Sequence, residues 1–429
     1  MKTLVLITSQ FPFGPGESFI GAEYPILAQS FDKILIISQN VTHEKTRVTS
    51  GTTIVYRYNP STSILGFLYL PFLLLVNLSA IFKLLVEECD FRKKAWNRLT
   101  LKNFAILIKK TIKAVQLRDF IRKTLLKEGI SESIIFYSYW LKTGAHAIAM
   151  LDYRGSIKIA RAHGSDVYEE KTEAGYLPLL RFTAVNLDAL FFASKDGKEY
   201  FEKKLNMEKP GFLVSSLGVN RSEFDFTKTM KSNKFVIVSC SNMIPLKRID
   251  LVIHALADIK SDKEIEWLHF GDGILKKELS DIARKILGPL NRITYKFMGY
   301  YPNEDLLKFY SANQIDLFIN TSSTEGIPVS IMEAQCFGVP VIATDTGGVK
   351  EVVIEGTGSL LPVNFSSNDL TKLIEYYSGL TEKESEIIRL NAMRNWESNF
   401  NATSNYKEFI MKVNSILAFA KLKDQSLLL

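Results

Sequence analysis

Two glutamates with seven residues between them, Glu325 and Glu333, form the most distinctive pattern in the sequence. They lie in the segment EGIPVSIMEA, in which Glu325 and Gly326 end a loop after an apolar run and Glu333 lies in a helix expected to begin about Val329. Amides at the start of a helix can hold a phosphate, and carboxylates accept hydrogen bonds from sugar hydroxyls. The segment therefore predicts a site for a ligand that contains both groups.

Two adjacent cations, Lys247 and Arg248, follow the apolar run Phe235–Cys240 at the expected start of a helix. This position favours a diphosphate over a neutral ligand, because lysine and arginine stabilise the charge on phosphate oxygens. The alternative is a solvated Lys-Arg pair that binds nothing. Glycine turns at Gly271 and Gly299 follow two further apolar runs, and each is either part of a ligand site or only a turn.

Two patterns in the N-terminal half also lie after apolar runs. His163 and Asp166 follow the run Ile157–Ala162, and open α/β sheets bind their ligands at the carboxyl ends of strands. That position favours a functional histidine over a structural one. The turn FPFGPGE places Gly14 and Gly16 between a predicted strand and a helix, where backbone amides can approach an anion closely, although a tight turn alone explains glycine there.

The elements that must position these residues alternate along the chain. Short apolar runs are separated by stretches with helical spacing, which is typical of a doubly wound α/β domain with a mostly parallel sheet. The predicted strands are Leu4–Ile7, Lys33–Ser38, Ile134–Tyr139, Ile157–Ala162, Ala189–Ala193 and Phe212–Ser215, then Phe235–Cys240, Glu266–Phe270, Ile293–Phe297, Leu317–Asn320 and Pro340–Ala343. The polar stretch Asn220–Lys234 separates the two series and is the predicted linker.

Length and composition agree with two soluble globular domains. The chain has 429 residues, of which 46% are hydrophobic and 23% charged, so it is neither disordered nor fibrous. Its three cysteines are odd in number and widely spaced, which indicates neither a disulfide framework nor a zinc site. The apolar run after Met1 is too short for a signal peptide and is predicted to be a buried strand.

One region departs from this pattern. Residues 58–82 contain no charged side chain, and Arg92–Lys127 holds twelve basic residues against one acid, Asp119, for a local charge of +11 within a chain of net charge +7. A single membrane crossing there would place parts of one sheet on opposite sides of a bilayer, which is impossible. Basic side chains interleaved with apolar ones favour docking on anionic lipids. A buried helical hairpin with a solvated basic face is the alternative, and no motif supports nucleic acid.

These motifs together resemble a known family. EGIPVSIMEA, GVPVIATDTGG and KEVV are similar to the donor-binding signature of family 4 glycosyltransferases, which are retaining enzymes of the GT-B fold. FPFGPGE, RAHGSDVYEE, LGVN, LKRIDLVIHAL, HFGDG and FMGYY occur in the family's order over most of the chain. The resemblance implies an α/β fold of two Rossmann-like, doubly wound domains that face a central cleft. It places an acceptor-binding domain at residues 1–222 with a membrane-associating insertion near 60–127, a donor-binding domain at 223–400, and a helix at 401–429 that packs back on the first domain.

The resemblance also implies a donor site. Glu333 would hold the ribose hydroxyls of the nucleotide, and Tyr300 or Tyr301 would lie beside the base. Amides near the start of the helix after Gly326 would meet the diphosphate together with Lys247. The other donor-binding residues that it implies are Gly16, Asn242, Gly271, Gly326, Ile327, Val329 and Ser330.

The implied catalytic residues are His163, Lys247, Arg248 and Glu325. His163 would contact the donor sugar near the reacting centre, and Glu325 would sit by its hydroxyls. Glu17 and Asp166 are assigned to the acceptor or sugar side. The chain has Asn242 where many members of the family carry an arginine, so Arg248 is expected to supply the second positive charge.

The implied reaction moves a sugar from a UDP- or GDP-sugar to a lipid-linked glycan in bacterial surface polysaccharide synthesis, with retention, without a metal or other cofactor, and without nucleic acid. The enzyme would be cytoplasmic and peripheral on the inner face of the membrane, held through Arg92–Lys127. An NAD-dependent oxidoreductase is disfavoured because Gly14-Pro15-Gly16 lacks the third glycine of its fingerprint. A soluble acceptor and a noncatalytic sugar-binding protein of the same fold are the alternatives.

Overall fold

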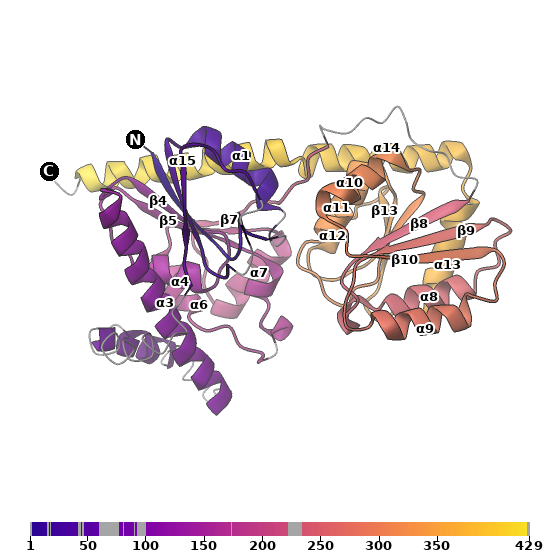
Figure 1. The fold of residues 1–429 in the computed structure, drawn as a ribbon, viewed down its shortest axis with the longest axis horizontal. Coiled ribbons are helices and arrows are strands. Elements are labelled where there is room, and N and C mark those ends of the chain that lie inside the picture. The colour runs from indigo at the N-terminus through magenta and orange to yellow at the C-terminus, as the bar shows by residue number, and fades with distance from the viewer. Residues whose placement is uncertain are drawn as a thin grey trace. The chain divides into compact units, whose positions relative to one another are not determined.

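The computed structural model describes residues 2–14, 17, 19–41, 44, 47–59, 77–79, 81–89, 91, 100–172, 174–221 and 234–426, with side chains up to residue 422. The chain divides into two compact units (Figure 1). The first unit combines residues 1–215 with residues 406–429, and the second contains residues 216–405. The sequence analysis placed this division at residue 222 and the start of the tail at residue 401.

The first unit is built on a parallel sheet of seven strands in the order β3-β2-β1-β4-β5-β6-β7. A parallel sheet covered on both faces needs strands that are apolar throughout, which is why these strands are recognisable as continuous apolar runs. The strands are β1 Thr3–Thr8, β2 Lys33–Ser38, β3 Thr53–Arg57, β4 Ile134–Ser138, β5 Ile157–Ala162, β6 Ala189–Phe192 and β7 Phe212–Val214.

Helices cover both faces of this sheet (Figure 1). Leu4 and Leu6 of β1 share a core with α1 and with the last helix, whereas Val5 and Ile7 share the opposite core with α3, α4, α6 and α7. The helices are α1 Ile20–Ser30, α3 Leu101–Lys127, α4 Thr143–Ala149, α5 Gly164–Val167, α6 Leu180–Asn186, α7 Lys195–Leu205 and α15 Ala402–Ser426, with a 3-10 turn η2 at Glu169–Lys171. Residues 81–89 are also helical.

The second unit is built on a parallel sheet of six strands in the order β10-β9-β8-β11-β12-β13. Its strands are β8 Phe235–Cys240, β9 Ile265–Phe270, β10 Ile293–Gly299, β11 Leu317–Asn320, β12 Val341–Thr344 and β13 Gly358–Leu361. Its helices are η3 Pro245–Lys247, α8 Ile249–Ala257, α9 Lys276–Ile286, α10 Asn303–Ala312, α11 Val329–Cys336, α12 Val349–Val352, α13 Ser367–Gly379 and α14 Glu382–Asn399. Helices α8, α9 and α13 pack on one face, and α10, α11 and α14 pack on the other.

Every strand predicted from the sequence is present, within one or two residues, and the α/β fold class is confirmed. The structure adds β3 and β13, each at an edge of its sheet. The side chains of β3 are only partly covered, so its sequence TIVYR lacks a continuous apolar run. The predicted linker and the uncharged run fall largely on residues 222–233 and 60–76, which lie outside the described residues. Within the described part of the chain, no helix has the length and apolarity needed to cross a membrane.

Candidate functional site

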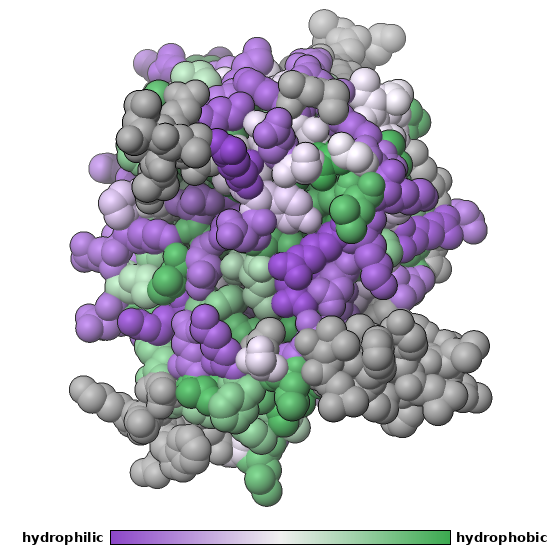
Figure 2. All heavy atoms as spheres, turned by 90° about the vertical axis from the view of Figure 1, so that its left-hand side faces the viewer, coloured by the Kyte–Doolittle hydropathy of each residue, from purple (hydrophilic) through white to green (hydrophobic). Residues whose placement is uncertain are grey.

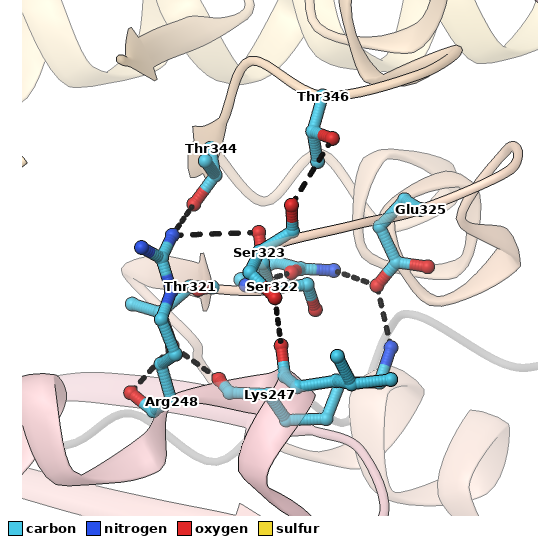
Figure 3. Close-up of polar contacts among 10 residues, drawn as sticks. Lys247, Arg248, Thr321, Ser322, Ser323, Glu325, Thr344 and Thr346 are labelled. Carbon is cyan, nitrogen blue, oxygen red and sulfur yellow. Dashed lines mark hydrogen bonds and ion pairs between the residues drawn. The ribbon is translucent and has the colours of Figure 1, made fainter. Parts of the chain in front are cut away.

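A lysine and a glutamate meet at the carboxyl ends of two adjacent strands of the second unit (Figure 3). Lys247 ends η3 after β8, and Glu325 lies in the loop after β11. Lys247 Nζ is 2.5 Å from Glu325 Oε1, and Asn320 Nδ2 donates to the same oxygen at 3.3 Å. The two side chains are 22% and 14% exposed, so the pair is accessible to a ligand.

The charges of this pair support each other. Burial raises the pKa of Glu325, but the Lys247 ammonium and its hydrogen bond outweigh that effect, so the net pKa lies below its ordinary value. Glu325 is therefore an acceptor-only carboxylate at neutral pH, and Lys247 remains a donor with two further N–H groups. The pair can bind a ligand whose hydroxyls donate to Glu325 and whose negative charge lies against Lys247.

Arg248 makes contacts that the sequence analysis did not anticipate (Figure 3). Its Nε donates to the carbonyl of Thr321 at 2.7 Å, Nη1 donates to the carbonyl of Val363 at 2.6 Å, and Nη2 donates to Thr344 Oγ1 at 3.1 Å. Its guanidinium also lies 4.8 Å from the centroid of the Phe365 ring. Arg248 thus links the loop after β8 to the loops after β11 and β13 and to the last residue of β12.

The backbone at Arg248 is left-handed, with φ of 46°. That conformation disfavours any residue with a Cβ atom, so the side-chain contacts must hold it in place. The turn it creates sends Lys247 toward Glu325 and Arg248 toward the neighbouring loops. Adjacent cations therefore face different partners.

Glu333 lies on α11 and is 6% exposed. Asn303, the first residue of α10, donates from Nδ2 to Glu333 Oε1 at 2.5 Å. Burial raises the pKa of Glu333 to about 7, against the lowering effect of the Asn303 hydrogen bond. The sequence analysis missed Asn303, although its place at the start of a helix directly after Tyr301 and Pro302 was a usable signal.

The start of α11 offers free backbone donors. The first amides of a helix have no acceptor within the helix, and α11 begins at Val329, directly after Gly326, Ile327 and Pro328. Ser330 and Val329 are partly exposed. Gly347, with φ of 55°, packs against this loop so closely that an added Cβ would lie 2.2 Å from the carbonyl oxygen of Glu325. The helix start is therefore held beside the Lys247–Glu325 pair.

Other predicted donor-side residues surround the same strand ends. Gly271 follows β9 with φ of 140°, and a Cβ there would lie 1.9 Å from the carbonyl oxygen of Ser241, so only glycine fits. Tyr301 packs edge-on against Phe270 at 5.1 Å between centroids, and Tyr300 is 61% exposed. The side chain of Asn242 is exposed.

In the first unit, the carboxylate of Glu17 is occupied by internal hydrogen bonds. It accepts from the amides of Ser9 at 2.9 Å and of Gln10 and Phe11 at 2.6 Å each. The indole N–H of Trp140 donates to the same carboxylate at 2.5 Å. Glu17 therefore holds the loop after β1 in shape. Gly16 lies outside the described residues.

Asp166 is fully buried and serves a similar purpose. Its carboxylate accepts from the Leu141 amide at 2.9 Å and from Ser165 Oγ at 2.7 Å, and Lys142 Nζ lies 3.2 Å away. These contacts join the loop after β4 to the short helix α5.

His163 is buried beside these loops. Its Nε2 lies 3.1 Å from the carbonyl oxygen of Tyr139, and its ring packs against Trp140 at 4.6 Å and against Phe19 at 5.8 Å. Burial lowers the pKa of His163 to about 4, although the Asp166 carboxylate acts in the opposite direction. His163 is therefore neutral at pH 7, and its ring can donate one hydrogen bond and accept another.

The structure thus gathers Lys247, Glu325, Glu333 and the start of α11 in one unit, and His163, Glu17 and Asp166 in the other. Each set lies at the carboxyl ends of parallel strands, which is the ligand-binding edge of open α/β sheets. The fold and these edges define a protein with two Rossmann-like units.

The comparison with protein families identifies the second unit. Residues 220–392 match the family described as Glycosyl transferases group 1. These residues make up most of the second unit, and their match agrees with the family that the motifs resemble.

Curated relatives include bacterial enzymes of glycan synthesis. The chain is 26% identical over 221 residues to an uncharacterized glycosyltransferase of Methanocaldococcus jannaschii, covering 50% of this chain and 57% of the relative. It is 27% identical over 236 residues to the GDP-mannose-dependent monoacylated alpha-(1-6)-phosphatidylinositol monomannoside mannosyltransferase of Corynebacterium glutamicum, covering 51% and 58%. It is 24% identical over 206 residues to the amylovoran biosynthesis glycosyltransferase AmsK of Erwinia amylovora, covering 46% and 48%. The chain spans about half the length of the curated relatives it matches.

Among solved structures, Anabaena HepE in complex with UDP and glucose aligns with a TM-score of 0.62 and 18% identity, over 96% of this chain and 99% of that one. This likeness shows the fold. The structural neighbours are GT-B glycosyltransferases, and the predicted GT-B class is confirmed.

Proposed function

We propose that this protein is a glycosyltransferase that moves a sugar from a nucleotide-sugar donor to a glycan acceptor. The observation that carries the proposal is the Lys247–Glu325 pair at 2.5 Å beside the start of α11, with the buried Glu333 on the same helix. A cation, free amides and two carboxylates suit a ligand made of a diphosphate between a ribose and a sugar.

Each donor-site residue has a role in this proposal. Glu333, oriented by Asn303, binds the ribose hydroxyls, and Glu325 binds hydroxyls of the donor sugar. Lys247 and the amides around Ile327, Val329 and Ser330 hold the diphosphate. Tyr301, fixed against Phe270, lies beside the base, with Tyr300, Gly271 and Asn242 at the margins.

The reaction breaks the bond between the anomeric carbon and the phosphate oxygen, and the electron pair leaves on the diphosphate. The acceptor hydroxyl oxygen forms the new bond from the same face, and its proton passes to the departing phosphate. The transition state resembles an oxocarbenium ion, so stabilising the departing charge is the main catalytic task. We assign that task to Lys247 and the α11 amides, which makes a metal ion unnecessary. His163, neutral at pH 7, acts as a hydrogen-bonding partner of the sugar.

Arg248, Glu17 and Asp166 take supporting roles in this proposal. Arg248 positions Lys247 by joining the surrounding loops. Glu17 and Asp166 shape the loops after β1 and β4, from which the first unit receives the acceptor.

We further propose a lipid-linked acceptor in bacterial surface polysaccharide synthesis, met on the cytoplasmic face of the membrane. The names of the Corynebacterium and Erwinia relatives support this direction, since one acts on a phosphatidylinositol mannoside and the other serves amylovoran biosynthesis. Figure 2 presents apolar side chains gathered at the lower end of one face of the first unit. The exposed apolar residues near the start of α3 and on the helix before it are Leu78, Phe82, Val86, Leu101 and Phe104.

A panel of nucleotide-sugars tests the reaction. We expect one UDP- or GDP-sugar to raise the unfolding temperature and to be hydrolysed slowly without acceptor. NMR of the released or transferred sugar should detect the donor's own anomeric configuration. An inverted product would overturn the retaining mechanism, and a panel with no ligand at all would overturn the function.

Flotation with vesicles tests the membrane proposal. The protein should float with anionic vesicles at 0.15 M salt and dissociate at about 1 M, because the Debye length falls from about 8 Å to about 3 Å. Phe82→Ser should weaken flotation, whereas the control Phe419→Ser, at an exposed apolar site on α15, should not. Flotation that ignores lipid charge and salt, or its absence, would instead support a soluble acceptor.

A further inference from the structure

A cavity of about 340 Å³ opens in the first unit at the carboxyl ends of β1, β2 and β4. Three lysines line it: Lys110 and Lys113 lie three residues apart on α3, and Lys142 follows β4. Trp140 and Tyr58 also line the cavity. None of these five residues was assigned a role from the sequence, apart from the general basic character of α3.

The positive charge in this cavity is poorly compensated. Burial lowers the pKa of Lys110, and the nearby charges of Lys113, Lys142 and Lys109 lower it further. Glu17, the acid that lines the cavity, is already committed to three backbone amides and the Trp140 indole. Lys142 already pairs with Asp166 at 3.2 Å, but Lys110 and Lys113 have no ion-pair partner among the described residues, so their charges are costly to hold together unless an anion joins them.

A tyrosine and a tryptophan lie beside these lysines in the lining of the cavity. Tyr58 is 8% exposed, and its hydroxyl has no hydrogen-bond partner among the described residues. A buried polar group without a partner costs free energy. Trp140 adds a half-buried aromatic surface next to the lysines, with Lys142 Nζ 4.9 Å from the ring centroid.

We propose that this cavity binds a diphosphate group, and that the diphosphate belongs to the lipid-linked acceptor. Lysines act as compact, mobile point charges, and three of them from two elements match a group with several negative charges better than a single carboxylate. The acceptor source rests on the proposed function, whereas the diphosphate site stands on the cavity alone.

Calorimetric titration of the full chain with inorganic pyrophosphate tests the site. Measured in the Lys247→Ala variant, in which the proposed donor site no longer competes for the anion, Lys110→Ala combined with Lys113→Ala should weaken binding at least tenfold. The control Lys203→Ala, at an exposed lysine on α7, should bind like the parent protein. Inorganic phosphate should bind at least tenfold more weakly than pyrophosphate. Equal binding of the two anions, or undiminished binding by the double variant, would overturn the proposal.

The same titration in the Lys247→Ala variant separates the cavity from the proposed donor site. Pyrophosphate binding should survive Lys247→Ala. If Lys247→Ala loses pyrophosphate binding and the double variant of the parent protein keeps it, the anion binds at the donor site and the cavity proposal is wrong. If pyrophosphate binds but no nucleotide-sugar is turned over, the cavity proposal stands and the proposed function is wrong.

A short-chain prenyl diphosphate and UDP distinguish the two sources of the diphosphate. In the Lys247→Ala variant, the prenyl compound should displace pyrophosphate and UDP should not. Displacement by UDP alone would show that the cavity receives a nucleotide, and the acceptor assignment would fall.

Discussion

The two units place acidic residues at equivalent edges of similar parallel sheets, yet they use them differently. In the second unit, the carboxylates of Glu325 and Glu333 are held by side chains, Lys247 and Asn303, and each keeps acceptor capacity for a ligand. In the first unit, Glu17 and Asp166 are turned inward onto backbone amides. The position of a carboxylate after a strand therefore does not decide its role; the partners that it accepts from do.

The basic residues of the two sites differ in the opposite way: those of the second unit have internal partners, and those of the first unit have fewer. Lys247 is paired with a carboxylate, and Arg248 is committed to loop carbonyls. In the first unit, Lys110 faces other lysines. Under the proposals above, the second unit presents carboxylates to hydroxyls around one cation, and the first unit presents cations to an anionic group. Five experiments can break or sharpen this comparison.

The largest effect is expected from Lys247→Ala. The substitution removes the preorganised cation and leaves the partly exposed Glu325 carboxylate without its ion-pair partner. Donor turnover should fall by about 10²–10³-fold in kcat, the usual loss for one charge-stabilising donor. Steady-state hydrolysis of the donor measures it, with Lys308→Ala at an exposed ion pair as the control. Turnover like that of the parent protein would remove Lys247 from the mechanism.

Glu17→Gln should act on stability instead. The amide nitrogen of glutamine would face N–H donors that the carboxylate now accepts from. The free energy of unfolding should fall by about 2–4 kcal/mol, because charge-assisted hydrogen bonds are lost and buried donors remain unpaired. Urea unfolding measures it, with the exposed Glu199→Gln as the control. Unchanged stability with slower transfer would instead return Glu17 to the sugar site.

Glu333 should make both binding and stability depend on pH. Its carboxylate ionises at about 7 in the folded protein, so donor affinity should rise as pH increases through 7, and Glu333→Gln should bind at least tenfold more weakly at pH 8. The unfolded chain releases this proton near pH 4.5, so the group's contribution to stability falls between pH 4.5 and 7.

Glu333→Gln therefore should be more stable than the parent at pH 8, by roughly 3 kcal/mol, and equally stable at pH 4. Urea unfolding at the two pH values checks the sign. A variant that is less stable at pH 8 would contradict the raised pKa.

Arg248→Ala should have a smaller effect on turnover than Lys247→Ala, about tenfold, together with a loss of about 1–2 kcal/mol of stability. The loop carbonyls of Thr321 and Val363 would lose their donor. Arg248→Gly should recover part of the stability, because glycine adopts the left-handed backbone without strain. Unchanged stability with a loss of turnover equal to that of Lys247→Ala would place Arg248 on the phosphate.

EDTA should have the smallest effect, with donor turnover unchanged, because Lys247 and the α11 amides carry the charge of the leaving group in this proposal. Turnover measured before and after dialysis against EDTA is the test, and complete loss would require a metal ion in the reaction.

Much of this architecture could be predicted from the sequence because buried parallel strands are uniformly apolar. The edge strand β3 was not predicted, because Ile54 and Arg57 are exposed and the strand therefore lacks a continuous apolar pattern. The ligand site around Glu325 and Glu333 could be predicted because the spacing of the two residues places one in a loop and the other in the following helix.

The side-chain assignments were harder to predict. Nothing in the dipeptide Lys247-Arg248 reveals that a left-handed turn directs the two side chains to different partners. The lysines of the cavity come from α3 and from the loop after β4, and only the folded sheet brings them together. The partners of Glu17 are backbone amides, which every sequence position provides, so no residue type marks them.

The last helix has a consequence for how the protein is made. Phe409, Ile410, Val413 and Leu417 belong to the same core as Leu4 and Leu6 of the first strand. At 5–20 residues per second, the ribosome needs roughly ten seconds or more to synthesise the intervening second unit. During that time, one face of the N-terminal sheet is covered by α1 but lacks the last helix. The second unit, which is continuous in sequence, can therefore complete its fold before the first, although the first unit begins earlier in the chain.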